Sequence, residues 1–234
     1  WVMTSPSQFR GAAPPALTSE TWARDLEEIR AVGGRASTRR SAEQTTLARF
    51  WDYSLPPVYH GVVRSVALQP GRTLADNARL FATVSQAMDD ALIAVFDAKY
   101  HYNFWRPVTA IRNADLDGHD ATTREPAWLP LIDVPMHPEY PSGHSILAGA
   151  VGAVLKAEVG TAPVELSTTS PTAPGVTRRW TRIDDFVDEV AMARVWGGLH
   201  YRHTNEVSIG MGRAIGELAV RQRQAVAPRP DGRS

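Results

Sequence analysis

The sequence predicts an all-α domain, a helical bundle, and three observations support this fold class. Apolar residues recur at spacings of three and four over most of the chain, as on one face of an α-helix. Serine or threonine residues suited to N-caps precede several of these stretches, and glycine or proline follows them. No fixed-period repeat is visible, which excludes solenoids and propellers. We expect one domain over 1–234, with a connector-like segment at 1–17 and a frayed tail at 224–234.

The pattern predicts helices in both halves of the chain. In the first half they cover 19–32, 41–51 and 73–99. Ser41 and Gln44 form a capping box at the start of the second helix, prolines 56 and 57 end it, and Thr73 caps the third. In the second half we expect helices over about 143–159, 184–196 and 205–223. Between the first two of these, residues 161–182 are rich in Thr, Ser and Pro and predict an irregular or hairpin excursion.

Composition excludes several classes of function. The 25 Lys and Arg residues balance 25 Asp and Glu, which argues against a broad nucleic-acid or acidic-membrane surface. The chain has no cysteine, so disulfides, thiolate metal sites and cysteine nucleophiles are excluded. Its longest apolar run, 145–155, is much shorter than the roughly 20 residues of a membrane span. The chain opens on Trp1 without a leader, and we expect a processed or truncated product.

Two separated segments carry groups that suit a small oxyanion. If a helix ends near Lys99 and the chain turns before residue 107, Lys99 and Arg106 can converge on one point. Ser142 and Gly143 fall where another helix begins, so their backbone N–H groups and the helix dipole attract an anion. Gly143 has no Cβ to hinder close approach. His144 follows on the first turn, where it could exchange a proton with a bound oxygen.

A third segment completes this candidate site. Arg194 is expected on the last turn of a helix that Gly197 and Gly198 break, which would return His200 to the same pocket. Two arginines, a lysine and helix-start amides can balance a dianion or trianion. A neutral nitrogen of His200 can then act as a ligand or a nucleophile at its centre.

These residues, in the order Lys-x6-Arg-Pro, Pro-Ser-Gly-His and Arg-x5-His, resemble the three-part signature of the vanadium haloperoxidase and type 2 phosphatidic-acid phosphatase superfamily. The sequence around them is similar to the bacterial and plant haloperoxidase-like branch. Members of that branch are longer, so the chain resembles their C-terminal half. The resemblance implies the helical bundle of that family. The family's tendency toward export implies a periplasmic or extracellular protein.

The resemblance also implies roles for individual residues. The oxygens of vanadate would be bound by Lys99, Arg106, Ser142, Gly143 and Arg194. His200 would be the vanadium ligand, His144 the acid–base residue, and Lys99 would polarise the peroxide. Hydrogen peroxide, a halide and a small organic acceptor would be the partners. Phosphate fits the same pocket, so a soluble acid phosphatase with a phosphohistidine intermediate is an alternative function.

Two positions near the motifs bear on this choice. His137 resembles the halide-side residue of haloperoxidases, and a histidine there is similar to the bromide-oxidising members. The family often has Asp four residues after the last motif histidine, pairing with its ring, whereas this chain has Thr204. The carboxylate or carbonyl that orients His200 must therefore come from elsewhere.

Structural roles for the same residues stay open from the sequence alone. Lys99 and Arg106 could satisfy carbonyls at a helix C-terminus, and Ser142 could be only an N-cap. Arg194 could pair with the acidic residues between 184 and 189. Zinc at His200 and His203, or calcium at 113–124, lacks the full ligand pattern. A non-catalytic oxyanion-binding fragment or subunit, with a missing N-terminal segment or a homo-oligomer covering exposed helix faces, is a further alternative.

Overall fold

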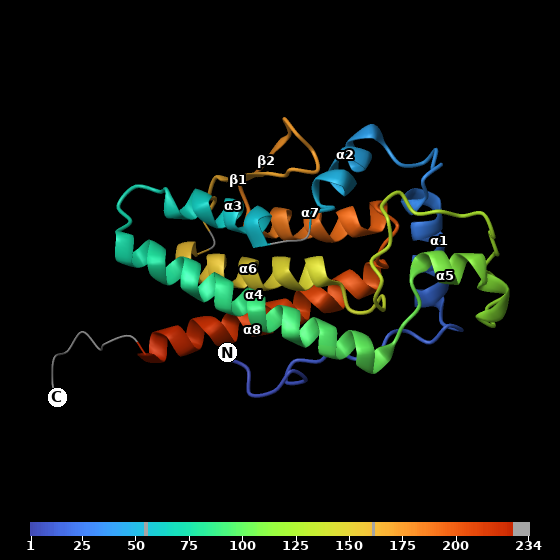
Figure 1. The fold of residues 1–234 in the computed structure, drawn as a ribbon, viewed down its shortest axis with the longest axis horizontal. Helices are drawn as coiled ribbons and strands as arrows, with labels where there is room; N and C mark the ends of the chain where they lie inside the picture. The colour runs from blue at the N-terminus through green and yellow to red at the C-terminus, as the bar shows by residue number, and fades with distance from the viewer. Residues whose placement is uncertain (54–55, 161, 227–234) are drawn as a thin grey trace.

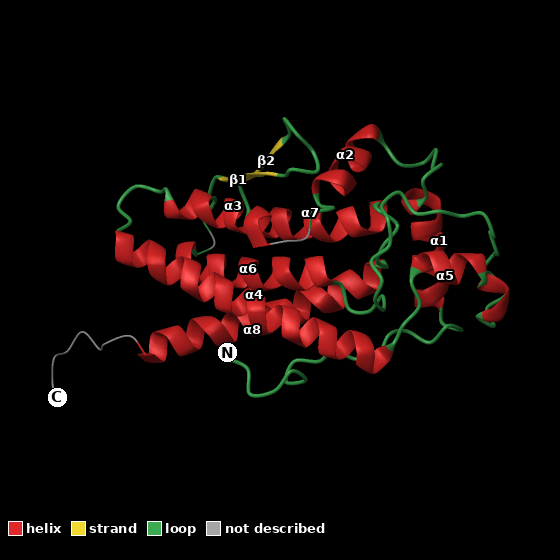
Figure 2. Cartoon of the chain, viewed as in Figure 1, coloured by secondary structure: helices red, strands yellow, loops and turns green. Residues whose placement is uncertain are grey.

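The computed structural model describes residues 1–53, 56–160 and 162–226. Its first helices are α1 (Glu20–Gly33), α2 (Ala42–Phe50), α3 (Pro56–Ala67), α4 (Leu74–Tyr102) and α5 (Pro107–Arg112). A 3-10 turn, η1 (Ala114–Leu116), and a long loop lead to α6 (Gly143–Val159), and the last helices are α7 (Ile183–Trp196) and α8 (Arg202–Val226). The molecule is a helical bundle, as the sequence predicts (Figures 1 and 2).

Local signals place the helix starts correctly where a polar cap is present. Ser41 and Gln44 form the reciprocal hydrogen bonds of a capping box, and Thr73 does so with Asp76. Helix α3 differs from the sequence prediction, which places no helix there because prolines 56 and 57 fit the end of the preceding helix. Proline is tolerated in the first turn, where its missing N–H has no intrahelical acceptor, so these residues also begin a helix.

The small-residue helix α6 lies at the centre of the bundle. It packs most extensively against α8 and also against α4 and α7 (Figure 1). Glycines allow the α6–α8 contact: a Cβ on Gly212 would lie 2.0 Å from the carbonyl oxygen of Ile146, and one on Gly216 would lie 2.5 Å from that of Ala150. Apolar burial on every side of α6 explains why its sequence shows no polar face.

The excursion after α6 contains the predicted hairpin. Strands β1 (Leu166–Thr169) and β2 (Thr177–Trp180) pair antiparallel, with Leu166 opposite Trp180. Trp180 is buried against the ring of Phe186 on α7, and its indole N–H donates to Glu189 at 3.1 Å. The hairpin packs mainly against α3 through β1 and also contacts α7 through β2.

The structure describes the expected connector at 1–17 and only the first residues of the expected tail at 224–234. Segment 1–17 forms no helix, but it is fastened to α4: the Val2 N–H donates to Asp90 at 2.7 Å, and the Tyr102 hydroxyl donates to the Gly11 carbonyl at 2.6 Å. Helix α8 continues through residues 224–226, and 227–234 lie outside the described residues. In the described part of the chain, no helix combines the length and apolarity that a membrane crossing requires.

Candidate oxyanion site

Four helix termini meet at one end of the bundle. Helices α4 and α7 end there, and α6 and α8 begin there (Figure 1). The loop between η1 and α6 runs across the same end. This arrangement brings the three sequence motifs together, because each motif lies at such a terminus.

Lys99 lies in the last turn of α4 and is fully buried. Its ammonium donates to the carbonyls of Pro138 at 2.8 Å, Glu139 at 2.9 Å and Pro141 at 2.5 Å. The lysine does satisfy carbonyls, but they belong to the loop before α6 and not to its own helix. It therefore ties the first motif to the second.

Arg106 is the residue before α5 and connects all three motifs. Its Nε donates to the carbonyl of His137 at 2.9 Å, and one terminal nitrogen donates to the carbonyl of Leu199 at 3.1 Å. The same terminal nitrogen lies 3.4 Å from Nε2 of His200, and the other lies 3.0 Å from Nδ1 of His137. Arg106 is 7% exposed, so its charge is largely removed from water.

The start of α6 supplies the second motif. Ser142 is the N-cap, and its hydroxyl accepts from the Ser145 N–H at 3.4 Å and donates to the Ser145 hydroxyl at 3.2 Å. Its backbone N–H, which the sequence analysis assigned to an anion, donates to the hydroxyl of Ser208 at 2.8 Å. The helix-start donors for an anion are thus those of Gly143 and His144, which have no intrahelical acceptor. A Cβ on Gly143 would meet nothing within 4 Å, so the space beside it is open.

Arg194 lies in the last turn of α7 and is 2% exposed. It donates to the Trp51 carbonyl. Pairing with the acidic residues between 184 and 189 is wrong, because Arg194 forms no ion pair with them in the described structure, and three of these acids have other partners: Asp184 pairs with Lys156, Asp185 with Arg182, and Glu189 with Arg178. Among the described residues, nothing accepts a hydrogen bond from Arg194 Nε.

His200 is paired with a residue that the sequence analysis missed. Its Nδ1 lies 2.9 Å from Oε1 of Glu139, a fully buried carboxylate in the loop before α6. The Tyr201 N–H donates to the same oxygen at 3.2 Å, and the Thr204 hydroxyl donates to Oε2 at 3.0 Å. In the sequence, this carboxylate stands three residues before Ser142, just outside the second motif. Nothing local links it to His200, so its role is visible only when the fold places the third motif beside it.

His144, unlike His200, has a ring nitrogen that lacks a hydrogen-bond partner among the described residues. This nitrogen is Nε2, and the residue is 9% exposed. Burial lowers its pKa well below the usual 6.5, and the charges of Arg194 and Lys99 lower it further. His144 is therefore neutral, with an unpaired ring nitrogen in a cationic pocket.

The pocket carries more positive than negative charge. Burial lowers the pKa of Lys99 well below its usual range, and the neighbouring Arg106 lowers it further. Burial also lowers the pKa of Arg194 to about 10. Among the described residues, the opposing buried carboxyl group is Glu139, whose pKa burial raises to about 7 although the charges of Lys99 and Arg106 oppose the rise. Burying like charges together is unfavourable unless an anion compensates them.

His137 lies at the edge of this pocket and is only partly buried. Its ring packs edge-on against Phe96 on α4, with centroids 5.3 Å apart. Burial lowers its pKa to about 4, and Lys99 contributes to that shift. A neutral imidazole between an aromatic ring and Arg106 is consistent with the predicted place beside a small anion.

The metal alternatives find no support in the described residues. No group of three or more His, Asp or Glu side chains there could hold a metal ion. Asp117, from the calcium-like segment, instead accepts from the Trp22 indole N–H at 2.8 Å and the His119 N–H at 2.9 Å. That segment is an Asx-stabilised turn, as its missing twelfth ligand indicates.

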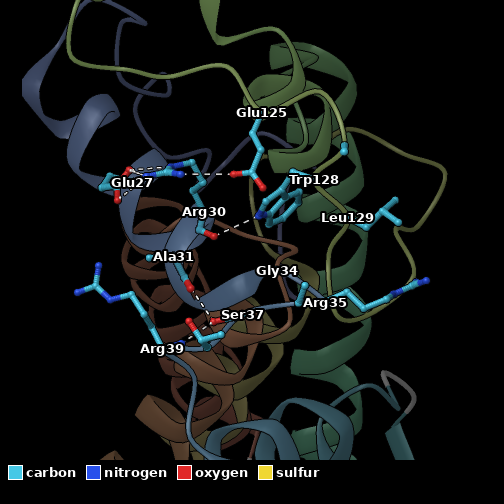
Figure 3. Close-up of a pocket in the computed structure, with 13 residues that line it drawn as sticks. Glu27, Arg30, Ala31, Gly34, Arg35, Ser37, Arg39, Glu125, Trp128 and Leu129 are labelled. Atoms are coloured by element: carbon cyan, nitrogen blue, oxygen red, sulfur yellow. Dashed lines mark hydrogen bonds and ion pairs between the residues drawn. The ribbon is translucent and has the colours of Figure 1, made fainter.

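A second cavity, of about 390 Å³, lies beside α1 and contains none of the predicted site residues (Figure 3). Two of its three arginines have acidic partners: Arg30 pairs with Glu27 at 2.8 Å and with Glu125 at 3.4 Å, and Arg35 pairs with Asp133 at 3.4 Å. These charges are largely compensated within the protein, which distinguishes this cavity from the buried cationic pocket.

The model of the VCPO second helical-bundle domain matches residues 79–228, which include all three motifs. The chain belongs to this family. Over 175 residues it is 34% identical to vanadium chloroperoxidase of Curvularia inaequalis, with 60% of this chain and 28% of that protein covered.

Solved structures agree with this assignment. A bacterial vanadium-dependent iodoperoxidase superposes with a TM-score of 0.78 at 30% identity, covering 94% of this chain and 54% of the other. An apo-type bacterial vanadium-dependent chloroperoxidase has the same TM-score at 24% identity and shares the fold, covering 96% and 54%. This chain therefore spans about half the length of these solved chains and less than a third of the Curvularia protein.

Proposed function

We propose that this chain is the vanadate-binding part of a vanadium-dependent haloperoxidase. The observation that carries the proposal is the excess of buried positive charge: Lys99, Arg106 and Arg194 surround a pocket whose buried carboxylate is Glu139. The unpartnered nitrogens of His144 and Arg194, and the open space at Gly143, fit a small oxyanion. Vanadate has the charge and the near-tetrahedral shape for this space.

The protein groups would divide the work as follows. Because Nδ1 of His200 faces a carboxylate, its Nε2 keeps a lone pair and can bind vanadium. Arg106, Arg194 and the Gly143 N–H would hold the oxygens, and Ser142 supports the helix start. Lys99 would act mainly through its charge, since its three donors already bind carbonyls. When bound, vanadate supplies a Lewis acid that activates hydrogen peroxide for attack by a halide. Neutral His144 would accept or return the proton beside it.

Bromide is the halide that we propose, on the basis of His137. Its neutral imidazole lies between Phe96 and Arg106 and leaves the arginine's positive charge available to a halide ion. The three relatives named above are called two chloroperoxidases and one iodoperoxidase. The halide preference of this chain is therefore a separate question from its family.

Bromination of a phenolic dye tests the proposal directly. The full chain is loaded with vanadate and supplied with hydrogen peroxide and chloride, bromide or iodide at equal concentrations, between mildly acidic and neutral pH. We expect vanadate-dependent product, formed faster with bromide than with chloride. The matched control is His200→Ala, which removes the vanadium ligand. Absence of halogenation above the buffer rate at every pH would overturn the proposal.

A second assay, with small phosphate esters as substrates, separates two alternative functions. A phosphatase would release phosphate from small esters and be inhibited by vanadate, with His200 attacking phosphorus and His144 protonating the leaving alcohol. A non-catalytic fragment would bind vanadate and phosphate without turnover of either substrate.

A further inference from the structure

The third motif of this chain does not carry its own carboxylate. Residue 204, one helical turn after His200, is a threonine and offers no charge to the imidazole. Its hydroxyl donates instead to Oε2 of Glu139, while Oε1 of the same group lies 2.9 Å from His200 Nδ1. The carboxylate thus stands between the two side chains and comes from a segment about 60 residues earlier.

We infer that Glu139 is a positioning residue for His200, which it holds in the tautomer with the proton on Nδ1 and a lone pair on Nε2, the nitrogen next to Arg106. This inference deepens the proposed function and rests on it. Thr204 acts in turn on Glu139, by holding the second carboxylate oxygen. In this chain, the carboxylate partner of His200 comes from the segment just before the second motif.

The hydrogen bonds around Glu139 support this tautomer. A backbone N–H can only donate, so the Tyr201 N–H identifies Oε1 as an acceptor. When Glu139 is ionised, Oε1 can only accept, and its 2.9 Å distance from Nδ1 then places the proton on that nitrogen. The other ring nitrogen, Nε2, lies 3.4 Å from a terminal nitrogen of Arg106, which is also only a donor. Both sides of the ring therefore favour the same tautomer.

Glu139 also connects His200 to Lys99. Its backbone carbonyl accepts from the lysine ammonium at 2.9 Å, while its side chain holds the imidazole. A substitution that keeps the backbone and the side-chain length tests the charge alone, so Glu139→Gln is the conservative variant. Glu139→Ala removes the side chain and opens space next to Thr204.

The tautomer of His200 and the affinity for vanadate can be measured separately. Nitrogen-15 NMR of histidine-labelled protein reads which ring nitrogen of His200 is protonated, without vanadate, and calorimetry gives the Kd of vanadate. We expect the wild type to show protonated Nδ1. Glu139→Gln should weaken vanadate binding by about 10- to 100-fold, the usual cost of losing a residue that orients a metal-binding histidine. Glu139→Ala should also lose the preference for protonated Nδ1.

A compensating variant separates positioning from general stability. Because the Thr204 hydroxyl lies 3.0 Å from the carboxylate, Thr204→Asp places an acid beside the space that Glu139→Ala vacates. The double variant should regain the tautomer and most of the affinity. Asp90→Asn, which alters another fully buried carboxylate nine residues before Lys99, is the matched control and should change neither measurement.

The inference is overturned if both Glu139 variants keep the wild-type tautomer and Kd. It is also overturned if the double variant folds, as its thermal midpoint would show, but retains the whole loss of Glu139→Ala. If the wild type fails to oxidise any halide, the proposed function fails, yet the NMR result still reports on Glu139.

Discussion

The two histidines of the pocket are buried to a similar degree but are held differently. His200 has a partner on each ring nitrogen, Glu139 at 2.9 Å and Arg106 at 3.4 Å. His144 has an Nε2 with no partner among the described residues. A ligand must keep one orientation, whereas an acid–base residue needs a free nitrogen for the reacting group. The surroundings of each ring therefore assign the roles more sharply than the motifs do.

The largest expected effect comes from removing each ring in turn. We expect His144→Ala to lower kcat for bromide oxidation by about 10²- to 10⁴-fold, the usual contribution of general acid–base catalysis, with a much smaller change in the Kd of vanadate. His200→Ala should instead raise that Kd by more than about 100-fold, because even residues behind a ligand contribute about 10- to 100-fold. Steady-state kinetics with calorimetry separates the two. Equal losses of affinity in both variants would contradict the division of roles.

A methyl group at Gly143 tests the open space on the His144 side. Gly143→Ala meets no atom within 4 Å, so the fold should tolerate it. If the anion approaches the Gly143 N–H, the methyl group should cost a charge-assisted hydrogen bond of about 1.5–3 kcal/mol, or roughly 10- to 100-fold in vanadate affinity. The matched control is Gly210→Ala on α8, which also meets no atom within 4 Å and should leave the Kd unchanged. Unchanged binding in Gly143→Ala would place the anion elsewhere.

The titration of His144 should respond to a bound anion. Burial and the charges of Arg194 and Lys99 lower its pKa, and phosphate or vanadate would oppose those charges. We expect its pKa, measured by NMR, to rise when phosphate is added, and the same rise should be absent in Arg194→Ala. A pKa that does not move with saturating phosphate would show that the anion does not reach this ring.

Acid should destabilise the protein through the same groups. The pKa values of His144 and His200 are lower in the folded protein than the usual 6.5, and that of His137 is about 4. Below pH 6.5 the unfolded chain therefore binds protons that the native protein does not, so the free energy of unfolding falls as pH drops toward 4. Urea titrations across this range should show the fall, and bound phosphate should reduce it.

The smallest effect is expected at Thr204. Thr204→Val keeps the shape but removes the hydrogen bond to Glu139, which should lower the free energy of unfolding by about 1.5–3 kcal/mol. Vanadate affinity should fall only a few-fold, since Glu139 keeps its bonds to Tyr201 and His200. Thr204→Ser, measured by urea unfolding, should be close to the wild type. A stable Thr204→Val protein would show that the threonine hydroxyl does not hold the carboxylate.

Much of the fold could be predicted from the sequence because its signals are local. The caps at Ser41 and Thr73 are formed within four residues, and the hairpin at 161–182 follows from turn-forming residues. The start of α3 could not be separated from the end of α2, because Pro56 serves equally as a helix breaker and as a first-turn residue.

The sequence by itself determined which chemical groups this protein could bring to a small anion: Lys99, Arg106, His144, Arg194 and His200 stand in recognisable motifs. Only the tertiary structure decided how their hydrogen bonds are distributed. The donors of Lys99 and the N–H of Ser142 form hydrogen bonds within the protein. The carboxylate next to His200 comes from a residue about 60 positions away in the sequence. The physical reason is that motif spacing reflects local geometry, whereas the pairing of a buried polar group depends on what long-range packing places against it.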